Sequence, residues 1–173
     1  MNNSAPHDRH VAWLGLGSNL AQPAQQVCQA LQELALAPGI ALLAVSELYR
    51  TTPVGGPPEQ PDYCNACAAI LCSMTPLALL DILQDIEARH GRVRDVRWGP
   101  RTLDLDLLAY DDLQLRQPRL RLPHPRAARR AFVLVPLAEI APALMLGRAR
   151  VCDHLRHVDD SGVGRWHETA GDA

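Results

Sequence analysis

The chain has 173 residues, of which 47% are hydrophobic and 21% are charged, and its formal net charge at pH 7 is −2. This balance is typical of a folded globular protein and excludes disordered and fibrous classes. The length fits one compact domain that buries a core without disulfide staples. We therefore expect a single domain over residues 11–158, preceded by a flexible segment at 1–10 and followed by a polar tail at 159–173.

All 17 basic residues are arginines, because the chain contains no lysine. A phosphate-loop ATPase needs a lysine on its phosphates, and a Schiff-base enzyme needs an amine, so both classes are excluded. Most of the arginines fall between Arg89 and Arg130, although the whole chain is close to neutral. Such a local cluster suits a small, multiply charged anion better than a nucleic acid, whose binders are usually basic overall.

No targeting or membrane-spanning segment is visible in the sequence. Residues 1–10 are polar, and the longest apolar stretch, 132–146, is interrupted by Pro136, Glu139 and Pro142. A membrane-spanning helix needs about 20 consecutive apolar residues. The five cysteines are an odd number without framework spacing, which indicates reduced thiols. We expect a cytoplasmic protein.

Two residue pairs look like metal motifs only superficially. Cys64 and Cys67 form a C-x-x-C pair inside a strand-like run, where residues three apart point to opposite faces. His154 and His157 are also three apart, but no matching carboxylate accompanies them. Neither pair predicts a metal or redox site.

Hydrophobic periodicity predicts alternating strands and helices. Strands are expected at 11–17, 40–49, 62–74 and 102–110, helices at 23–37 and 77–90, a hairpin completed by 113–122, and short helices at 125–130 and 133–140. Thr75 and Pro76 fit the cap and the first position of the helix that follows them. Gly15-Leu16-Gly17-Ser18-Asn19 lacks the third glycine of a dinucleotide loop, since Leu20 stands there, and we interpret it as a tight strand exit. This alternation predicts an α/β or α+β sandwich.

The strongest chemical signal is the pair Asp104 and Asp106 on the strand expected at 102–110. Side chains alternate along a strand, so both carboxylates share one face, with their Cα atoms about 7 Å apart. They can converge on one hard cation or on two, and oxygen ligands favour Mg²⁺, which commonly carries nucleotide phosphates. Taken alone, the pattern is also typical of a solvated strand face.

Basic residues surround this acidic pair in the sequence. The loop before it contains Arg92, Arg94, Arg97 and Arg101. A second group follows at a strand-to-helix boundary: His124, Arg129 and Arg130. Because arginine presents a planar fork of donors that matches phosphate oxygens, both groups are candidate contacts for a triphosphate. The alternative to phosphate binding is a solvated basic surface that binds no ligand.

A flat heterocycle has candidate contacts at Tyr63 and Asn65. They are two apart on a predicted strand and face the same way, so one can stack on a ring while the other hydrogen-bonds its edge. Phe132, the only phenylalanine in the chain, lies beside Arg130 and offers a second stacking face. An aromatic core residue beside an incidental asparagine would show the same pattern.

Together these residues resemble the 6-hydroxymethyl-7,8-dihydropterin pyrophosphokinase family, over about residues 11–144. The most specific part is RWGPRTLDLDLL at 97–108. Supporting matches are Gly17-Ser18-Asn19, Tyr49-Arg50-Thr51, QPDYCNA at 60–66, GRVR at 91–94, Pro123-His124 and PLAEIAP at 136–142. Pro125 stands where the family pattern has a tyrosine, and Arg121 where it has a small hydroxyl residue.

The resemblance implies a ferredoxin-like fold, a three-layer sandwich with a central, mostly antiparallel sheet and helices on both faces. It implies a monomer that transfers pyrophosphate from ATP to the hydroxymethyl group of the pterin in folate biosynthesis, with two Mg²⁺ ions and with AMP as second product. The implied metal ligands are Asp104 and Asp106, and Arg92 and Arg101 join them as catalytic residues. Further implied contacts are Arg92, Arg101, His124 and Arg130 with phosphates; Trp98 in the catalytic loop; Gln84, Glu87 and Leu107 near the nucleoside; and Thr52, Pro53, Val54, Gly55, Tyr63, Asn65 and Phe132 with the pterin.

Two other functions stay open from the residues alone. Another Mg²⁺-dependent nucleotidyl or phosphoryl transferase is one, because many such sites combine D-x-D with arginines. An RNA-binding module on a similar sandwich is the other, but aromatic residues are only 4% of the chain, too few for an extended stacking platform. We expect small-molecule substrates, and neither a nucleic acid nor a membrane as partner.

Overall fold

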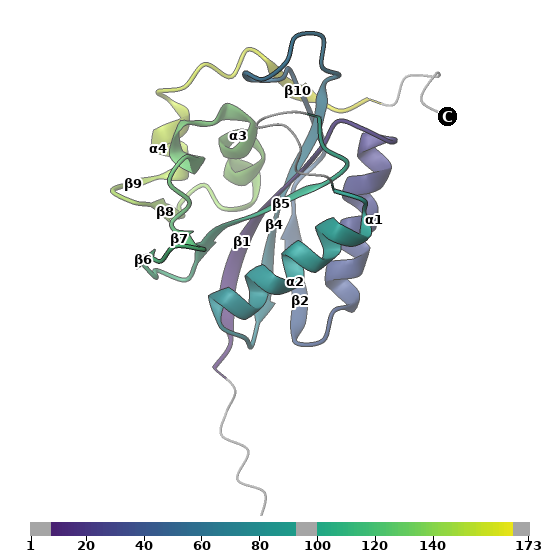
Figure 1. Ribbon diagram of the computed structural model, residues 1–173. Coiled ribbons are helices and arrows are strands. Elements are labelled where there is room, and N and C mark those ends of the chain that lie inside the picture. The colour runs from purple at the N-terminus through teal and green to yellow at the C-terminus, as the bar shows by residue number, and fades with distance from the viewer. Residues whose placement is uncertain (1–7, 93–99, 168–173) are drawn as a thin grey trace, which may run out of the picture.

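The structure is a computed structural model and describes residues 8–92 and 100–167. In chain order its elements are β1 (His10–Ser18), α1 (Pro23–Leu36), β2 (Ile40–Val45), β3 (Tyr49–Thr51), β4 (Tyr63–Cys72), α2 (Pro76–Arg89), β5 (Asp104–Tyr110), β6 (Leu115–Arg116), β7 (Arg121–Leu122), the 3₁₀ helix η1 (Ala127–Arg129), α3 (Ala131–Ile140), β8 (Met145–Leu146), β9 (Ala149–Arg150), α4 (Val151–Leu155) and β10 (Val163–Arg165). Figure 1 shows their arrangement.

Within the described residues, six strands form one antiparallel sheet in the order β10-β3-β4-β1-β5, and β2 also pairs with β4. β3 pairs with the first residues of β4 and β2 with the last, so the two share one edge of that strand. With α1 following β1 and α2 following β4, this is the β-α-β-β-α-β order of a ferredoxin-like fold. The antiparallel sheet expected from the resemblance is therefore confirmed.

Helices cover both faces of the sheet, which makes three layers (Figure 1). Buried side chains of α1 and α2 form one core with the sheet, and side chains of α3 and α4 form a second core on the opposite face. Cys64 belongs to the first core and Cys67 to the second, which confirms that they point to opposite faces. All five cysteines are free thiols.

The two long helices begin and end as their sequences predict. In α2 the Thr75 hydroxyl accepts a hydrogen bond from the Ala78 amide at 3.3 Å, and Pro76 occupies the first turn. Gly91 follows the helix with a φ of +70°, a conformation that favours glycine. The buried positions of each helix recur at helical spacing and face the sheet.

Several boundaries differ from the sequence expectation. The single strand expected at 40–49 is two strands, β2 and β3, because the chain leaves β4 between them. The alternation expected over 102–110 holds from Asp104 to Leu108 and breaks at Ala109, because a bulge opposite Trp13 and Leu14 leaves Leu108 and Ala109 in the same core. The short helix expected at 125–130 is reduced to η1, and α3 begins two residues earlier than predicted.

The polar tail expected at 159–173 requires a correction. Residues 163–165 form β10, which pairs with β3 as an edge strand of the main sheet, and Trp166 packs against the core under α1 and α2. The segment looked like a tail because its strand has only three residues and its pairing partner lies far away in the sequence. Residues 1–7 and 168–173 lie outside the described part of the chain.

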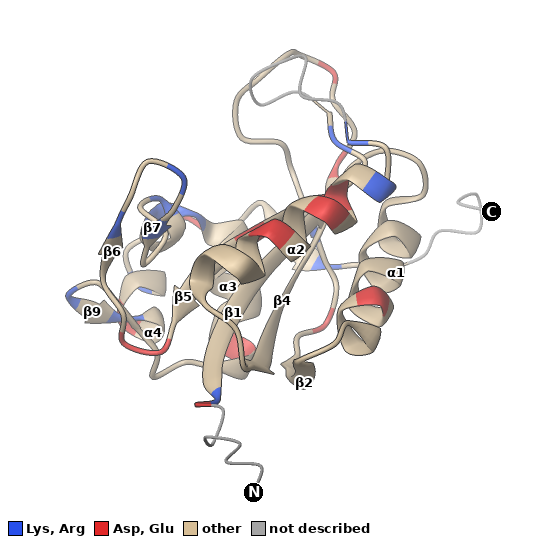
Figure 2. Ribbon diagram, turned by 60° about the horizontal axis from the view of Figure 1, so that its bottom comes forward, with Lys and Arg blue, Asp and Glu red and all other residues tan. Residues whose placement is uncertain are grey.

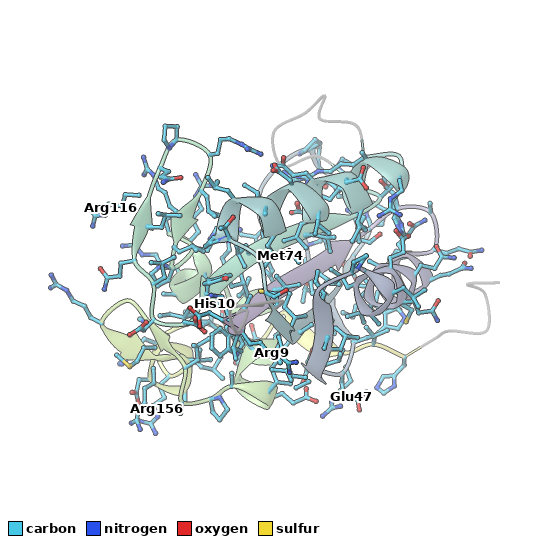
Figure 3. The ribbon with its side chains drawn as sticks, turned by 90° about the horizontal axis from the view of Figure 1, so that it is seen from below. Arg9, His10, Glu47, Met74, Arg116 and Arg156 are labelled. Atoms are coloured by element: carbon cyan, nitrogen blue, oxygen red, sulfur yellow. The ribbon has the colours of Figure 1, made fainter. Side chains whose placement is uncertain are left out.

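The end of the sheet where β1 begins faces the viewer in Figure 3, with His10 and Met74 near the middle of the view. There the His10 ring nitrogen lies 2.7 Å from an Asp111 carboxylate oxygen, and the Tyr110 hydroxyl donates to the Met74 carbonyl at 2.5 Å. The acidic pair of β5 lies at the opposite end, where β1 ends. None of the described helices is long and apolar enough to cross a membrane.

Candidate functional site

Two glycines of β1, the strand between β4 and β5, leave space on the α3 face of the sheet. Gly17 pairs with Asn65 of β4 on one side and with Asp104 of β5 on the other, and Gly15 pairs with Asp106. A Cβ atom at Gly17 would lie 2.6 Å from the Asn65 side-chain oxygen, so only glycine leaves room for that side chain. β1 ends at Ser18, one residue after Gly17, so this segment lies at the end of a strand, as the sequence interpretation expected.

Asp104 and Asp106 project from the same face of β5, as predicted, because the intervening Leu105 packs into the core beneath α1 and α2. Arg92 contacts one carboxylate oxygen of Asp104 at 2.8 Å, and Arg101 contacts the other at 2.6 Å. Two predicted phosphate-binding arginines therefore converge on a predicted metal ligand.

Asp106, like Asp104, is partly buried. Burial, and then the nearby negative charge of Asp104, raise the pKa of the Asp106 carboxyl to about 7, although Arg130 acts in the opposite direction. A cation placed between the two carboxylates would relieve the repulsion that raises this pKa.

Glu87 connects the end of α2 to β5. Its carboxylate accepts the Leu105 amide at 2.7 Å and also pairs with Arg92, which bridges Glu87 to Asp104. Burial raises the pKa of Glu87 above its ordinary value. In Figure 2, acidic and basic positions stand close together at this end of α2. These contacts make Glu87 an anchor for Arg92 and for the first residues of β5, the strand that bears Asp104.

Asn19 fixes two loops at the rim of the site. Its side-chain oxygen accepts the Arg101 amide at 2.8 Å, its own amide donates to the Arg101 carbonyl at 3.0 Å, and its side-chain nitrogen donates to the Pro61 carbonyl at 3.1 Å. The sequence showed Asn19 only as part of Gly17-Ser18-Asn19 and gave it no role. The available signal was an asparagine just after a predicted strand. Asn19 is buried in the structure, and a buried asparagine side chain needs hydrogen-bond partners.

A cavity of about 490 Å³ opens beside these residues. It is lined by Thr51, Thr52, Pro53, Val54, Gly55, Tyr63, Asn65, Arg101, Asp104, Asp106, Arg126, Arg129, Arg130 and Phe132. All seven residues predicted to contact a pterin are among them. Thr51 and Arg126 were not predicted, although the spacing of Arg126, Arg129 and Arg130 around η1 indicated a shared basic face.

One end of the cavity combines aromatic rings with polar groups. Tyr63 and Phe132 both line it, and the Arg130 guanidinium lies 5.4 Å from the centre of the Phe132 ring. The Asn65 side-chain nitrogen donates to the Thr51 hydroxyl at 2.6 Å, which leaves the Asn65 oxygen directed past Gly17. Burial raises the pKa of the Tyr63 hydroxyl, so the ring stays neutral. This end is suited to a flat heterocycle with polar edges.

Five of the predicted site residues within the described part of the chain do not line this cavity. Two of them, Glu87 and Arg92, pair with each other next to Asp104. Leu107 has its side chain in the core at 2% exposure, so only its backbone is available to a ligand. The Gln84 side chain accepts from Arg119 at 3.5 Å on the outer surface of α2. His124 is half-buried behind the cavity, where burial and Arg130 lower its pKa to about 4 and keep it neutral. Trp98 lies outside the described residues.

A second cavity, of about 550 Å³, adjoins the first. The two share Thr51, Thr52, Val54, Arg129, Arg130 and Phe132. The rest of its lining comes from Ala128, Ala131 and the C-terminal residues His154, His157, Val158, Asp159, Gly162 and Val163. His154 and His157, for which no metal role was predicted, therefore lie in a hollow that the sequence did not indicate.

The donor set fits a hard divalent cation. Within residues 8–92 and 100–167 no group of three or more His, Cys, Asp or Glu side chains is arranged to hold a metal ion. Asp104 and Asp106 offer two carboxylates on the face of β5 that borders the cavity. Two carboxylates are what Mg²⁺ commonly takes from a protein when water and substrate phosphates complete its coordination.

Known proteins are similar to this chain in sequence. A sequence model of the family described as 7,8-dihydro-6-hydroxymethylpterin-pyrophosphokinase matches residues 13–142. A 2-amino-4-hydroxy-6-hydroxymethyldihydropteridine pyrophosphokinase of Methylorubrum extorquens is 48% identical over 154 residues, which covers 89% of this chain and 97% of the relative. Its counterpart in Pseudomonas aeruginosa is 50% identical over 138 residues, with 80% and 85% covered.

The chain belongs to the 7,8-dihydro-6-hydroxymethylpterin-pyrophosphokinase family. The resemblance stated from the sequence is therefore confirmed. All the predicted site residues fall within the part of the chain that the pyrophosphokinase family model matches, whereas the C-terminal wall of the second cavity falls beyond it.

Solved structures support the fold of this pyrophosphokinase. The wild-type HPPK-DHPS of Plasmodium falciparum with pteroate superimposes with a TM-score of 0.69 at 13% identity. The match covers 87% of this chain and 42% of that longer one, so the chain spans less than half the length of that protein. At this low identity the likeness shows the ferredoxin-like fold alone.

Proposed function

We propose that the chain transfers the pyrophosphoryl group of ATP to the hydroxymethyl group of 6-hydroxymethyl-7,8-dihydropterin and releases AMP, a step of folate biosynthesis. One observation carries the proposal: a single cavity joins the two stacking rings, Tyr63 and Phe132, to the carboxylate pair of β5. A heterocycle and a nucleotide's phosphates can therefore meet in one space.

The pterin occupies the aromatic end in this proposal. Its ring stacks between Tyr63 and Phe132, which line the cavity together. Asn65 and the backbone of residues 52–55 hydrogen-bond the polar edge of the ring, since they line the same end. The hydroxymethyl group then points toward the carboxylate pair.

The phosphates of ATP lie at the charged end. Arg92 and Arg101 hold the oxygens of Asp104 in the structure, and both guanidinium groups can exchange this carboxylate for phosphate oxygens. Arg130 lines the cavity close to Asp106 and adds a third positive charge. His124 is neutral and stands behind Arg130, so it would contact a phosphate as a hydrogen-bond donor and not as a charge. Glu87 assists by anchoring Arg92.

Asp104 and Asp106 would hold two Mg²⁺ ions together with the nucleotide. When bound, the ions supply neutralisation of the negative charge on the phosphates. Each carboxylate lies on the face of β5 that borders the cavity, so neither needs to change strand or face to reach a phosphate-bound cation. The chain contributes two ligands and the cavity that borders them.

The transfer itself makes one bond and breaks one. The hydroxymethyl oxygen of the pterin forms a bond to the β-phosphorus, the bond from that phosphorus to the oxygen of the α-phosphate breaks, and AMP leaves with that oxygen. The hydroxyl proton is released. The arginines hold reactants in line and stabilise the charge that develops on the phosphate oxygens. One chain supplies every proposed residue, so a monomer suffices.

Product analysis tests the proposal. The purified protein is incubated with ATP, Mg²⁺ and 6-hydroxymethyl-7,8-dihydropterin, and the products are resolved by anion-exchange chromatography and ³¹P NMR. AMP and the pterin diphosphate in equal amounts support it, and a reaction with EDTA in place of Mg²⁺ should give neither. ADP would instead indicate a simple kinase, and free pyrophosphate a nucleotidyl transferase.

A further inference from the structure

The wall formed by Thr51, Thr52 and Val54 has a hollow on each side. These residues line both the proposed pterin cavity and the second cavity beyond it. A segment between two hollows lacks packed side chains that fix its position from either side. The position of this wall must therefore be fixed by the backbone on either side of it and by the strands that pair with β3.

The C-terminal strand supplies that pairing. β10 lies antiparallel to β3, with Val163 opposite Thr51 and Gly164 opposite Arg50. Beyond the strand ends, the Thr52 amide donates to the Gly162 carbonyl at 3.3 Å and the Trp166 amide donates to the Leu48 carbonyl at 2.8 Å.

Hydrogen-bonded pairs recur at every second position of an antiparallel ladder. The Gly164–Arg50 pair lies midway between the two contacts that flank the strand, so Gly164 and Arg50 exchange ladder bonds. The hydrogen-bonded ladder thus runs unbroken from Leu48 to Thr52, which is part of the wall.

Side-chain contacts reinforce this pairing on both faces of β3. The Arg50 guanidinium lies 4.4 Å from the centre of the Trp166 ring, and the Arg165 guanidinium lies 5.5 Å from the centre of the Tyr49 ring. The Tyr49 hydroxyl donates to Glu139 of α3 at 2.6 Å. β3 is thereby held between the C-terminal segment and α3.

A shift of β3 would reach the pterin end of the cavity directly. Thr51 pairs with Tyr63 across the sheet, and its hydroxyl accepts the Asn65 side chain at 2.6 Å. The residues proposed to stack on the pterin and to bond its edge are therefore coupled to Thr51. The charged end depends on β5, α2 and Asn19, which have no part in the β3–β10 ladder.

We infer that β10, which lies beyond the residues matched by the family model, is a positioning element for the pterin-binding wall of the active site. The inference rests on the proposed assignment of this cavity to the pterin. It predicts that disturbing β10 weakens pterin binding selectively and leaves ATP binding nearly unchanged.

Gly164 offers a matched pair of variants. A Cβ atom there meets no atom within 4 Å, so Gly164→Ala keeps the ladder donor and fits without a clash. Gly164→Pro removes the N–H group that the ladder uses. Trp166→Ala and Trp166→Phe form a second pair, since phenylalanine retains an aromatic face for Arg50 and alanine does not.

Two readouts are measured on each folded variant: the dissociation constant for 6-hydroxymethylpterin, by ligand fluorescence, and KM for ATP and for the dihydropterin. We expect Gly164→Pro and Trp166→Ala to weaken pterin binding by about tenfold or more, with KM for ATP within about twofold of the unmodified protein. Gly164→Ala should match the unmodified protein, and Trp166→Phe should recover most of the loss.

Two results would overturn the inference: unchanged pterin binding in folded Gly164→Pro and Trp166→Ala, or equal losses for pterin and ATP, which would mean a general structural role. If Gly164→Pro does not fold, the Trp166 pair decides. Because pterin binding is measured without turnover, an unmodified protein that binds the pterin but forms no AMP would refute the proposed reaction without touching this test.

Discussion

Arg101 and Asp104 face each other three residues apart, with a guanidinium nitrogen 2.6 Å from a carboxylate oxygen. Arg92 holds the other oxygen of the same carboxylate, so Asp104 is doubly paired. A nucleotide that brings cations and phosphates offers each group a new partner, since the carboxylate can take the cation and the arginines the phosphates. The charged groups proposed to meet the nucleotide therefore lie together at one end of β5.

Removing either carboxylate should abolish most of the activity. We expect Asp104→Asn and Asp106→Asn to lower kcat/KM by about hundredfold or more, because each loses a ligand whose charge stabilises the transition state. Steady-state AMP formation measures the effect, and circular dichroism checks the fold. Asp112→Asn, at an exposed turn beyond β5, is the matched control and should act like the unmodified protein. A near-normal rate in either site variant would refute the metal role.

The same Asp106→Asn change should stabilise the metal-free fold. The pKa of Asp106 is raised to about 7 in the folded state, so between its ordinary acidic range and neutrality the folded chain binds more protons than the unfolded chain. Its contribution to the free energy of unfolding therefore falls as pH rises through that window. We expect the variant to gain roughly 1–3 kcal/mol at about pH 8, which raises Tm by several degrees.

Thermal melts of both proteins in EDTA at several pH values test this expectation. The gain should shrink as pH falls toward about 4, because Asp106 is then protonated in the folded chain and begins to take up its proton in the unfolded chain. A variant that melts lower than the unmodified protein at about pH 8 would show that Asp106 is a net stabilising charge.

Gly17 should be required for pterin binding through Asn65. A Cβ atom at Gly17 would lie 2.6 Å from the Asn65 side-chain oxygen, so Gly17→Ala must displace that side chain from its place in the cavity. We expect the dissociation constant for 6-hydroxymethylpterin to rise about tenfold. In a double-mutant cycle, the same substitution should have little further effect once Asn65 is already alanine. Fully additive losses would mean that Gly17 acts by another route.

Tyr63 should contribute its ring and not its hydroxyl. Tyr63→Ala removes one stacking face of the cavity, and we expect pterin binding to weaken by about 1–3 kcal/mol while ATP binding changes little. Tyr63→Phe keeps the ring and should bind nearly as the unmodified protein does. Isothermal titration with each ligand measures both affinities, and equal losses for pterin and ATP in Tyr63→Ala would count against the stacking assignment.

Local patterns carried most of what the sequence predicted correctly. The common face of Asp104 and Asp106 and the opposite faces of Cys64 and Cys67 follow from the two-residue repeat of strands. The start of α2 follows from the side-chain cap of Thr75. Each of these depends on neighbours within a few residues.

The features that the sequence missed depend on distant partners. β10 is too short for a periodic signal and exists because β3 offers a free edge. Asn19 gains its role only when Arg101 and Pro61 fold back on it. The space that Gly17 leaves for the Asn65 side chain is visible only once β4 pairs with β1. Tertiary contacts decide all three.

The central claim is that Asp104 and Asp106 jointly hold the cations that carry the phosphates of ATP beside the pterin. Electron paramagnetic resonance of Mn²⁺, titrated with α,β-methylene-ATP and 6-hydroxymethylpterin, counts the bound ions directly. The account predicts two ions per chain in the unmodified protein and fewer in Asp104→Asn and Asp106→Asn, with Asp112→Asn unchanged. An equal number of bound ions in all four proteins would contradict it.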